Sequence, residues 1–199
     1  DIAWWENETI HRSAFFPNPD GEHLVDGSFD SPSDVYAVDM DGDGDLDVLG
    51  AAWYASEIAW WENTGACEGT DGVCSTWVEH LVRDGFYNAG AVYAADLDGD
   101  GDQDVLGAAP GIDDITWWEN TGPCDGTDGA CTAWTEHLVD GDFEGAHDVS
   151  VADLDGDGDP DVLGAARYAE DIVWWENDGS PRNGGWAKHT VDGDYESAR

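Results

Sequence analysis

The sequence carries very little positive charge. Six basic residues, with a single lysine at position 188, stand against 46 acidic residues, and the formal net charge is −40. Such a surface repels phosphate groups, so neither nucleic acid nor an anionic membrane is expected as a partner. It suits a medium rich in calcium or salt, where screening weakens self-repulsion. The alternative explanation is that acidic turns simply recur along the chain.

Long apolar runs, helical patterns and catalytic motifs are also missing. No apolar stretch approaches about 18 residues, so no transmembrane helix is expected. No segment keeps a helical period. No signal peptide is recognised, and the chain starts at Asp1 without Met, so any such segment is expected to have been removed or to lie outside this sequence. No HExxH motif, phosphate loop or Ser/His/Asp ordering occurs, so no catalytic residue is predicted.

One acidic segment occurs three times in the sequence. It reads Asp-Met-Asp-Gly-Asp-Gly-Asp-Leu-Asp at 39–47 and recurs at 96–104 and 153–161, each time 57 residues further on. Four alternating carboxylates with no basic partner repel one another unless a cation lies among them. Ca²⁺ is the hard, oxygen-seeking ion that suits such a cluster. An Asp/Gly turn without metal is the alternative.

The loop opens like an EF-hand but cannot be one. An EF-hand needs a bidentate Glu at loop position twelve and a helix on each side. Position twelve is Gly50, Gly107 or Gly164 here, inside a stretch that reads as a β-strand.

The surroundings of the loop predict four short strands in each repeat. In the first repeat these are 34–39, 47–53, 57–63 and 77–82. The third strand reads Ile-x-Trp-Trp-Glu-Asn in every repeat, and adjacent Trp side chains point to opposite faces of a strand. Both faces must therefore be covered, as in the blade of a β-propeller, which has about 50 residues. A β-solenoid is the competing architecture, but its coils are usually shorter.

Asp-x-Asp-Gly-Asp-Gly-x-x-Asp followed by Val-Leu-Gly-Ala resembles the FG-GAP repeat of integrin α-subunit propellers. With the Trp-Trp strand, the chain is similar to the FG-GAP-like, or VCBS-type, repeats of bacteria and archaea. The resemblance implies that each loop joins the first two strands of a blade and binds one calcium ion, three in total. The implied side-chain ligands are Asp39, Asp41, Asp43, Asp47, Asp96, Asp98, Asp100, Asp104, Asp153, Asp155, Asp157 and Asp161. The implied carbonyl ligands are those of Asp45, Asp102 and Asp159.

The predicted architecture is an all-β propeller segment of about three and a half four-stranded antiparallel blades. Residues 1–33 supply only the second half of a blade, and the full blades are predicted at 34–90, 91–147 and 148–199. A half-blade exposes unpaired strand edges and apolar area. The chain is therefore expected to be part of a longer polypeptide, or to contact neighbouring subunits through its terminal blades.

The four cysteines form two local pairs, Cys67/Cys74 and Cys124/Cys131, in equivalent loops. A disulfide within each loop is expected, which implies an oxidising compartment. Zinc is the alternative, although neither pair has a second pair or a histidine nearby. The last repeat has a shorter loop without Cys at 178–185, so the bridges are not required for the fold.

Histidines recur in the fourth strand of each repeat, at His23, His80, His137 and His189, and are expected to be architectural. Residues that do not repeat are better candidates for a unique ligand or partner site, although solvated loops are the alternative. These are His11, Arg12, Phe15, Phe16, Arg83, Phe86, Tyr87, His147, Arg167, Tyr168 and Arg182.

We interpret the sequence as an extracellular or cell-surface, calcium-binding module for adhesion, binding or assembly, and not as an enzyme. A lectin-like carbohydrate-binding propeller is one alternative, and a polysaccharide lyase is another. A lectin should expose Trp or Tyr in equivalent pockets. A lyase should gather non-repeated His, Arg, Tyr and Lys at one ring end, and an assembly module should make contacts through its terminal half-blades.

Overall fold

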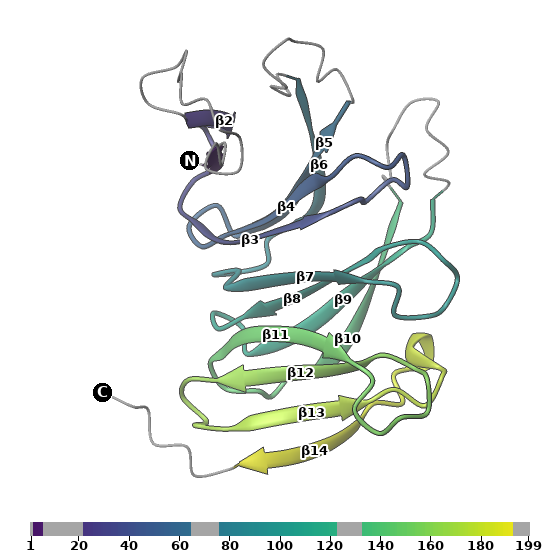
Figure 1. Ribbon diagram of the computed structural model, residues 1–199. Coiled ribbons are helices and arrows are strands. Elements are labelled where there is room, and N and C mark those ends of the chain that lie inside the picture. The colour runs from purple at the N-terminus through teal and green to yellow at the C-terminus, as the bar shows by residue number, and fades with distance from the viewer. Residues whose placement is uncertain (1, 6–21, 65–75, 123–132, 193–199) are drawn as a thin grey trace, which may run out of the picture.

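The computed structural model describes residues 2–5, 22–64, 76–122 and 133–192, which fold into β-strands and a single turn of 3-10 helix, η2 (Pro181–Asn183) (Figure 1). An N-terminal pair contains β1 (Ile2–Trp5) and β2 (Glu22–Asp26). The first sheet contains β3 (Pro32–Val38), β4 (Asp47–Ala52), β5 (Glu57–Asn63) and β6 (Trp77–Asp84). The second contains β7 (Ala91–Ala95), β8 (Asp104–Ala109), β9 (Asp114–Asn120) and β10 (Trp134–Asp140). The third contains β11 (Ala146–Ala152), β12 (Asp161–Ala166), β13 (Ile172–Glu176) and β14 (Ala187–Asp192).

The strands of each sheet follow one another in space in the order of the chain, and every pairing is antiparallel. The three sheets stack face to face, and β7 contacts both β3 and β11, so the first strands of the blades are neighbours (Figure 1). The fold-class prediction is therefore confirmed: the chain is all-β and its four-stranded sheets are arranged as propeller blades.

The N-terminal strands form a two-stranded antiparallel sheet. Residue 4 of β1 pairs with residue 23 of β2, and the same Trp–His pairing joins Trp60 to His80 in the first full sheet. In register, strands β1 and β2 thus correspond to the third and fourth strands of the first full sheet.

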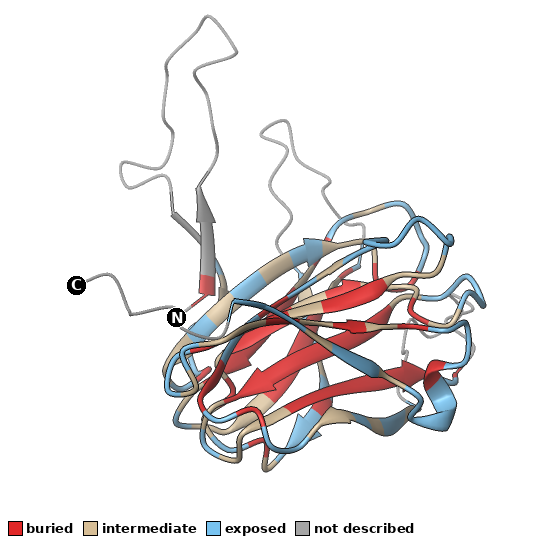
Figure 2. Cartoon of the chain, turned by 90° about the horizontal axis from the view of Figure 1, so that it is seen from below, coloured by how far each residue is buried: buried red, intermediate tan, exposed pale blue. Residues whose placement is uncertain are grey.

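The Trp-Trp strands supply the core between the sheets. Trp60, Trp61, Trp117 and Trp118 are all buried, one of each pair on either face of its sheet. Phe86, in the connection between the first two sheets, meets Trp118 edge to face, with ring centroids 4.9 Å apart. Buried residues lie along the stacked faces and exposed residues at the rims (Figure 2).

Two further predictions from the sequence concern the cysteines and membrane-spanning helices. The four cysteines and the segment 6–21 lie outside the described residues, so the disulfide pairing stays a prediction. Within the described part of the chain, no helix is long and apolar enough to cross a membrane.

The glycine in the second strand of each blade allows neighbouring sheets to approach closely. A Cβ atom on Gly107 would lie 2.8 Å from Ile58 Cδ1 of the preceding sheet and 3.0 Å from Trp118 Cζ3. Gly107→Ala should therefore lower the free energy of unfolding by roughly 1–3 kcal/mol through overpacking. Chemical denaturation followed by tryptophan fluorescence measures this. Gly122→Ala is the matched control, because its Cβ would approach no atom of the described residues closer than 3.4 Å. Equal stability of the two variants would contradict the packing of the sheets.

Candidate metal centres

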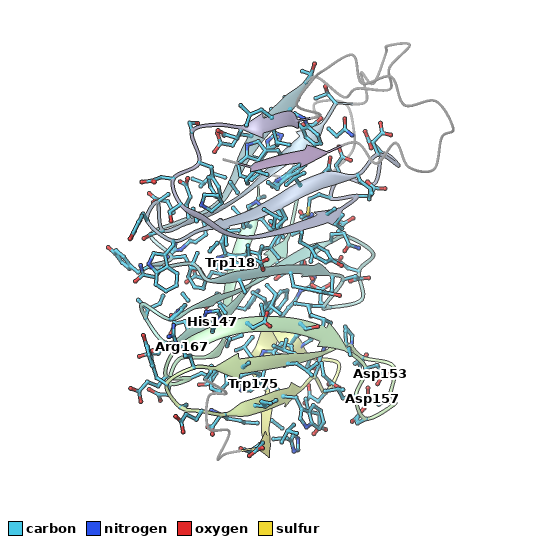
Figure 3. All side chains as sticks on the ribbon, turned by 60° about the vertical axis from the view of Figure 1, so that its left-hand side comes forward. Trp118, His147, Asp153, Asp157, Arg167 and Trp175 are labelled. Carbon is cyan, nitrogen blue, oxygen red and sulfur yellow. The ribbon has the colours of Figure 1, made fainter. Side chains whose placement is uncertain are left out.

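Each acidic loop joins the first and second strands of a full blade, so the three loops lie at the same end of the stack. They connect β3 to β4, β7 to β8 and β11 to β12. Figure 3 labels Asp153 and Asp157 in the third loop. The glycines at loop positions four and six have positive φ angles, 75° at Gly42 and 99° at Gly44, which L-residues rarely adopt. This is the local reason for the Gly-x-Gly spacing between aspartates.

Aspartates inside the loops fold the backbone around themselves. Asp41 Oδ1 accepts a hydrogen bond from the Asp43 N–H at 3.1 Å, and Asp43 Oδ1 accepts one from the Asp45 N–H at 2.8 Å. The same turns recur in the other two loops. One oxygen of each carboxylate is used in this way, and its second oxygen is left for another partner.

Three carboxylates converge in every loop, with one ligand atom from each within 4.8 Å of the others. Position three belongs to every cluster, as does position one, whereas the third member varies between positions five and nine. The clusters are Asp39, Asp41 and Asp43; Asp96, Asp98 and Asp104; and Asp153, Asp155 and Asp161. The remaining predicted side chains, Asp47, Asp100 and Asp157, stand outside these groups. The carbonyl ligands predicted at Asp45, Asp102 and Asp159 stay predictions.

The ninth aspartate has a structural role that the sequence did not reveal. Asp104 is fully buried, and its Oδ2 accepts a hydrogen bond from the Leu97 N–H at 2.9 Å while Oδ1 accepts one from the Asn120 N–H at 2.9 Å. Asp47 makes the equivalent bonds to Met40 and Asn63. The ninth carboxylate therefore ties the start of the loop to the end of the third strand.

The asparagine that ends the Trp-Trp-Glu-Asn strand is the second residue that sequence reasoning missed. Asn63 Nδ2 donates to the Leu46 carbonyl at 3.2 Å, and Asn120 Nδ2 donates to the Gln103 carbonyl at 3.3 Å. Both carbonyls belong to loop position eight. This asparagine recurs in all three repeats, and that recurrence was the one sign of its role in the sequence. Only the structure shows that its side chain binds the carbonyl at loop position eight.

The recurring histidines have partners within their own blades. His80 Nε2 lies 2.8 Å from Glu62 Oε2, and its ring stacks on Trp60 with centroids 4.4 Å apart. His137 makes the same contacts with Glu119 and Trp117. A set that repeats in this way is part of the blade architecture, as predicted.

Burial and neighbouring charge make the loops costly without a cation. Burial raises the pKa of Asp104 to about 7, and it does the same to Asp47, in spite of the backbone N–H donors. Burial also raises the pKa of Asp41, with the charges of Asp43 and Glu62 adding to the effect. In the first loop, Asp39 Oδ1 is buried and accepts no hydrogen bond from the described residues. An all-oxygen, acidic donor set with an unused buried oxygen fits a metal ion, so the three clusters could each hold one.

These features define a propeller-blade protein with an acidic loop at one end of each full blade. Residues 39–107 and 96–164 match the model of the FG-GAP-like repeat. Together the two matches run from 39 to 164, more than half of the chain, and the chain belongs to the FG-GAP-like repeat family. No curated protein sequence matches it.

The raised pKa values predict how stability depends on pH in excess chelator. Because the pKa of Asp104 is about 7 in the folded state and its ordinary value is 3.8, its contribution is complete below about pH 4 and is lost as pH rises through about 7. Asp104→Asn should reduce the fall in unfolding free energy between about pH 4.5 and 7.5 by roughly 2–4 kcal/mol.

Urea denaturation at the two pH values measures this change. Asp102→Asn is the control, because it removes a charge from an exposed side chain of the same loop. If the unfolding free energies of Asp104→Asn and Asp102→Asn depended on pH in the same way, burial would not be the cause of the raised pKa of Asp104.

Proposed function

We propose that this chain is an extracellular or cell-surface, calcium-stabilised β-propeller segment that acts as a binding or assembly module and not as an enzyme. The observation that carries the proposal is the convergence of three carboxylates in every loop of a chain with a net charge of −40. Ca²⁺ suits these loops better than transition metals, because no His or Cys belongs to any of the described clusters. The millimolar calcium of extracellular media supports the proposed location.

Calcium should stabilise the fold by mass action. At about 100-fold saturation each site adds roughly 2.7 kcal/mol, so excess chelator should lower the melting temperature markedly. Asp43→Ala should remove one bound ion of three, whereas Asp30→Ala, on an exposed residue outside the loops, should remove none. Elemental analysis and calorimetric melting test this. An unchanged melting curve in chelator, with no metal in the purified protein, contradicts the calcium assignment.

The outward face of the third sheet supports an assembly role. Loop position two is 2% exposed at Met40 and 1% exposed at Leu97, because the following blade covers both, whereas Leu154 is 45% exposed. On the same face, Leu163 and Trp174 are half-buried, although the equivalent Leu and Trp in the first two sheets are fully buried. In the first two sheets, the equivalent face is covered by the following blade. We therefore assign this face of the third sheet to another blade of the same kind, from a longer chain or from a second copy.

The segment alone, with calcium, should accordingly self-associate. Its sedimentation coefficient should rise with concentration, and Leu154→Gln should lower it by removing apolar area from the open face. Leu138→Gln is the control, because Leu138 lies in an outer strand and the equivalent Leu81 is similarly exposed. A compact monomer at every concentration would contradict this role.

Carbohydrate binding is the second candidate, and exposed tyrosines favour it. Tyr54 and Tyr168 occupy equivalent turns, β4–β5 and β12–β13, and are 73% and 64% exposed. Tyr87 is 61% exposed in the β6–β7 connection, where the neighbouring Asn88 donates to the Trp53 carbonyl at 3.3 Å. By topology these segments lie at the end opposite the acidic loops, as Figure 3 illustrates for Arg167 and Asp157. Rigid, amphipathic rings of this kind suit stacking on sugar rings.

Affinity electrophoresis through gels that contain neutral or uronate polysaccharides tests the second candidate. At least one polysaccharide should retard the chain, and Tyr87→Ala should weaken the affinity about fivefold, because stacking contributes on the order of 1 kcal/mol. Leu81→Ala, also exposed but on an outer strand, should leave it unchanged. Retardation by none of the polysaccharides, or equal retardation of Tyr87→Ala, rules this candidate out.

A further inference from the structure

One arginine crosses from the third blade into the acidic loop of the second. Arg182, in η2, places Nη2 2.5 Å from Asp98 Oδ2 and 3.0 Å from Asp100 Oδ2. Its Nε lies 2.7 Å from Glu119 Oε1, on the strand below that loop. The guanidinium therefore contacts three carboxylates of the neighbouring blade at once.

The contact reaches the metal cluster itself. Asp98 belongs to the carboxylate group of the second loop, and its side chain is only 2% exposed. Asp98 Oδ2 accepts no hydrogen bond from the described residues. Its charge is balanced by the ion pair with Arg182. The arginine thus binds an oxygen that a cation in this loop would need.

The segment that carries Arg182 is held against the second loop by a further bond. Asn177 Nδ2 donates to the Leu97 carbonyl at 3.0 Å, across the boundary between the two blades. Gly179 follows with φ of +77°, and a Cβ atom there would lie 2.8 Å from Asp159 Oδ2 of the third loop. Residues 177–182 therefore bridge two acidic loops, and the arginine is delivered to the second one.

No such cation reaches the other two loops from the described residues. Arg182 contacts the loop of the preceding blade, so the equivalent segment for the first loop is 121–133, which contains neither Lys nor Arg. Among the described residues, Arg182 is the one basic side chain in an ion pair with a carboxylate of an acidic loop. The three loops share a sequence but differ in electrostatic environment.

We propose that Arg182 is a built-in competitor for the cation at the second loop, which makes this site weaker than the other two and couples it to the contact between the second and third blades. The inference rests on the proposed calcium binding at the loops. If the guanidinium stays in place when Ca²⁺ binds, the two positive groups repel each other; if it moves away, its ion pairs are lost. Both routes weaken binding at this loop alone, by roughly tenfold for charges a few ångströms apart in water.

Calorimetric titration of the full chain with Ca²⁺ tests the proposal. The wild-type chain should show two tighter sites and one weaker site. Arg182→Gln should tighten the weak site about tenfold and leave the other two within twofold. Arg167→Gln is the matched control, because it makes the same charge change on an exposed residue at the opposite end of the blades (Figure 3). Adding Asp98→Ala to the Arg182→Gln chain should abolish the tightened site, because Asp98 belongs to the carboxylate cluster of the second loop.

Each outcome of the titration decides the matter. Three equal sites in the wild-type chain overturn the proposal, and so does a weak site that Arg182→Gln leaves unchanged. Equal tightening by Arg167→Gln overturns it as well, because the effect would then come from net charge. The wild-type result stands even where a variant does not fold. Absence of calcium binding at every loop would instead refute the proposed function on which the inference rests.

Discussion

Repulsion among carboxylates at one end of the blades is the constraint on which the rest of the structure depends. Each turn between the first two strands gathers aspartates whose oxygens lie within 4.8 Å of one another. In the second and third loops one of them, Asp104 or Asp161, is buried completely. Backbone N–H groups offset part of this cost, but the pKa of Asp104 is still about 7. A bound cation would supply the missing positive charge. It would hold the loop closed and thereby fix how the second strand begins.

The loops also connect the blade core to its rim. The ninth aspartate joins loop and third strand, and that strand carries the two tryptophans that fill the spaces on either side of the sheet. Because each blade contacts mainly its neighbours, stability should be close to a sum over blades and interfaces. The exposed face around Leu154 then lacks the stabilising free energy of one interface between blades. This is the physical reason for proposing another blade there.

Strands and loops could be read from the sequence because their signals are local. The strand predicted at 57–63 agrees with β5, and that predicted at 47–53 differs from β4 by one residue. Asp/Gly spacing likewise places the loop, since it dictates positive φ at positions such as Gly44. Contacts between segments far apart in the chain were not predictable. Arg182 meets Asp98 only because stacking brings the third blade's loop over the second, and no periodicity encodes that register.

Anomalous diffraction from crystals grown in millimolar Ca²⁺ shows whether each acidic loop binds an ion. One anomalous peak is expected in each loop, at 39–47, 96–104 and 153–161, surrounded by oxygen ligands at about 2.3–2.6 Å. The peak in the second loop should have the lowest occupancy when calcium is limiting. Loops without a peak under these conditions, with the strands otherwise unchanged, would show that the carboxylates are held together by the fold alone and would contradict the account.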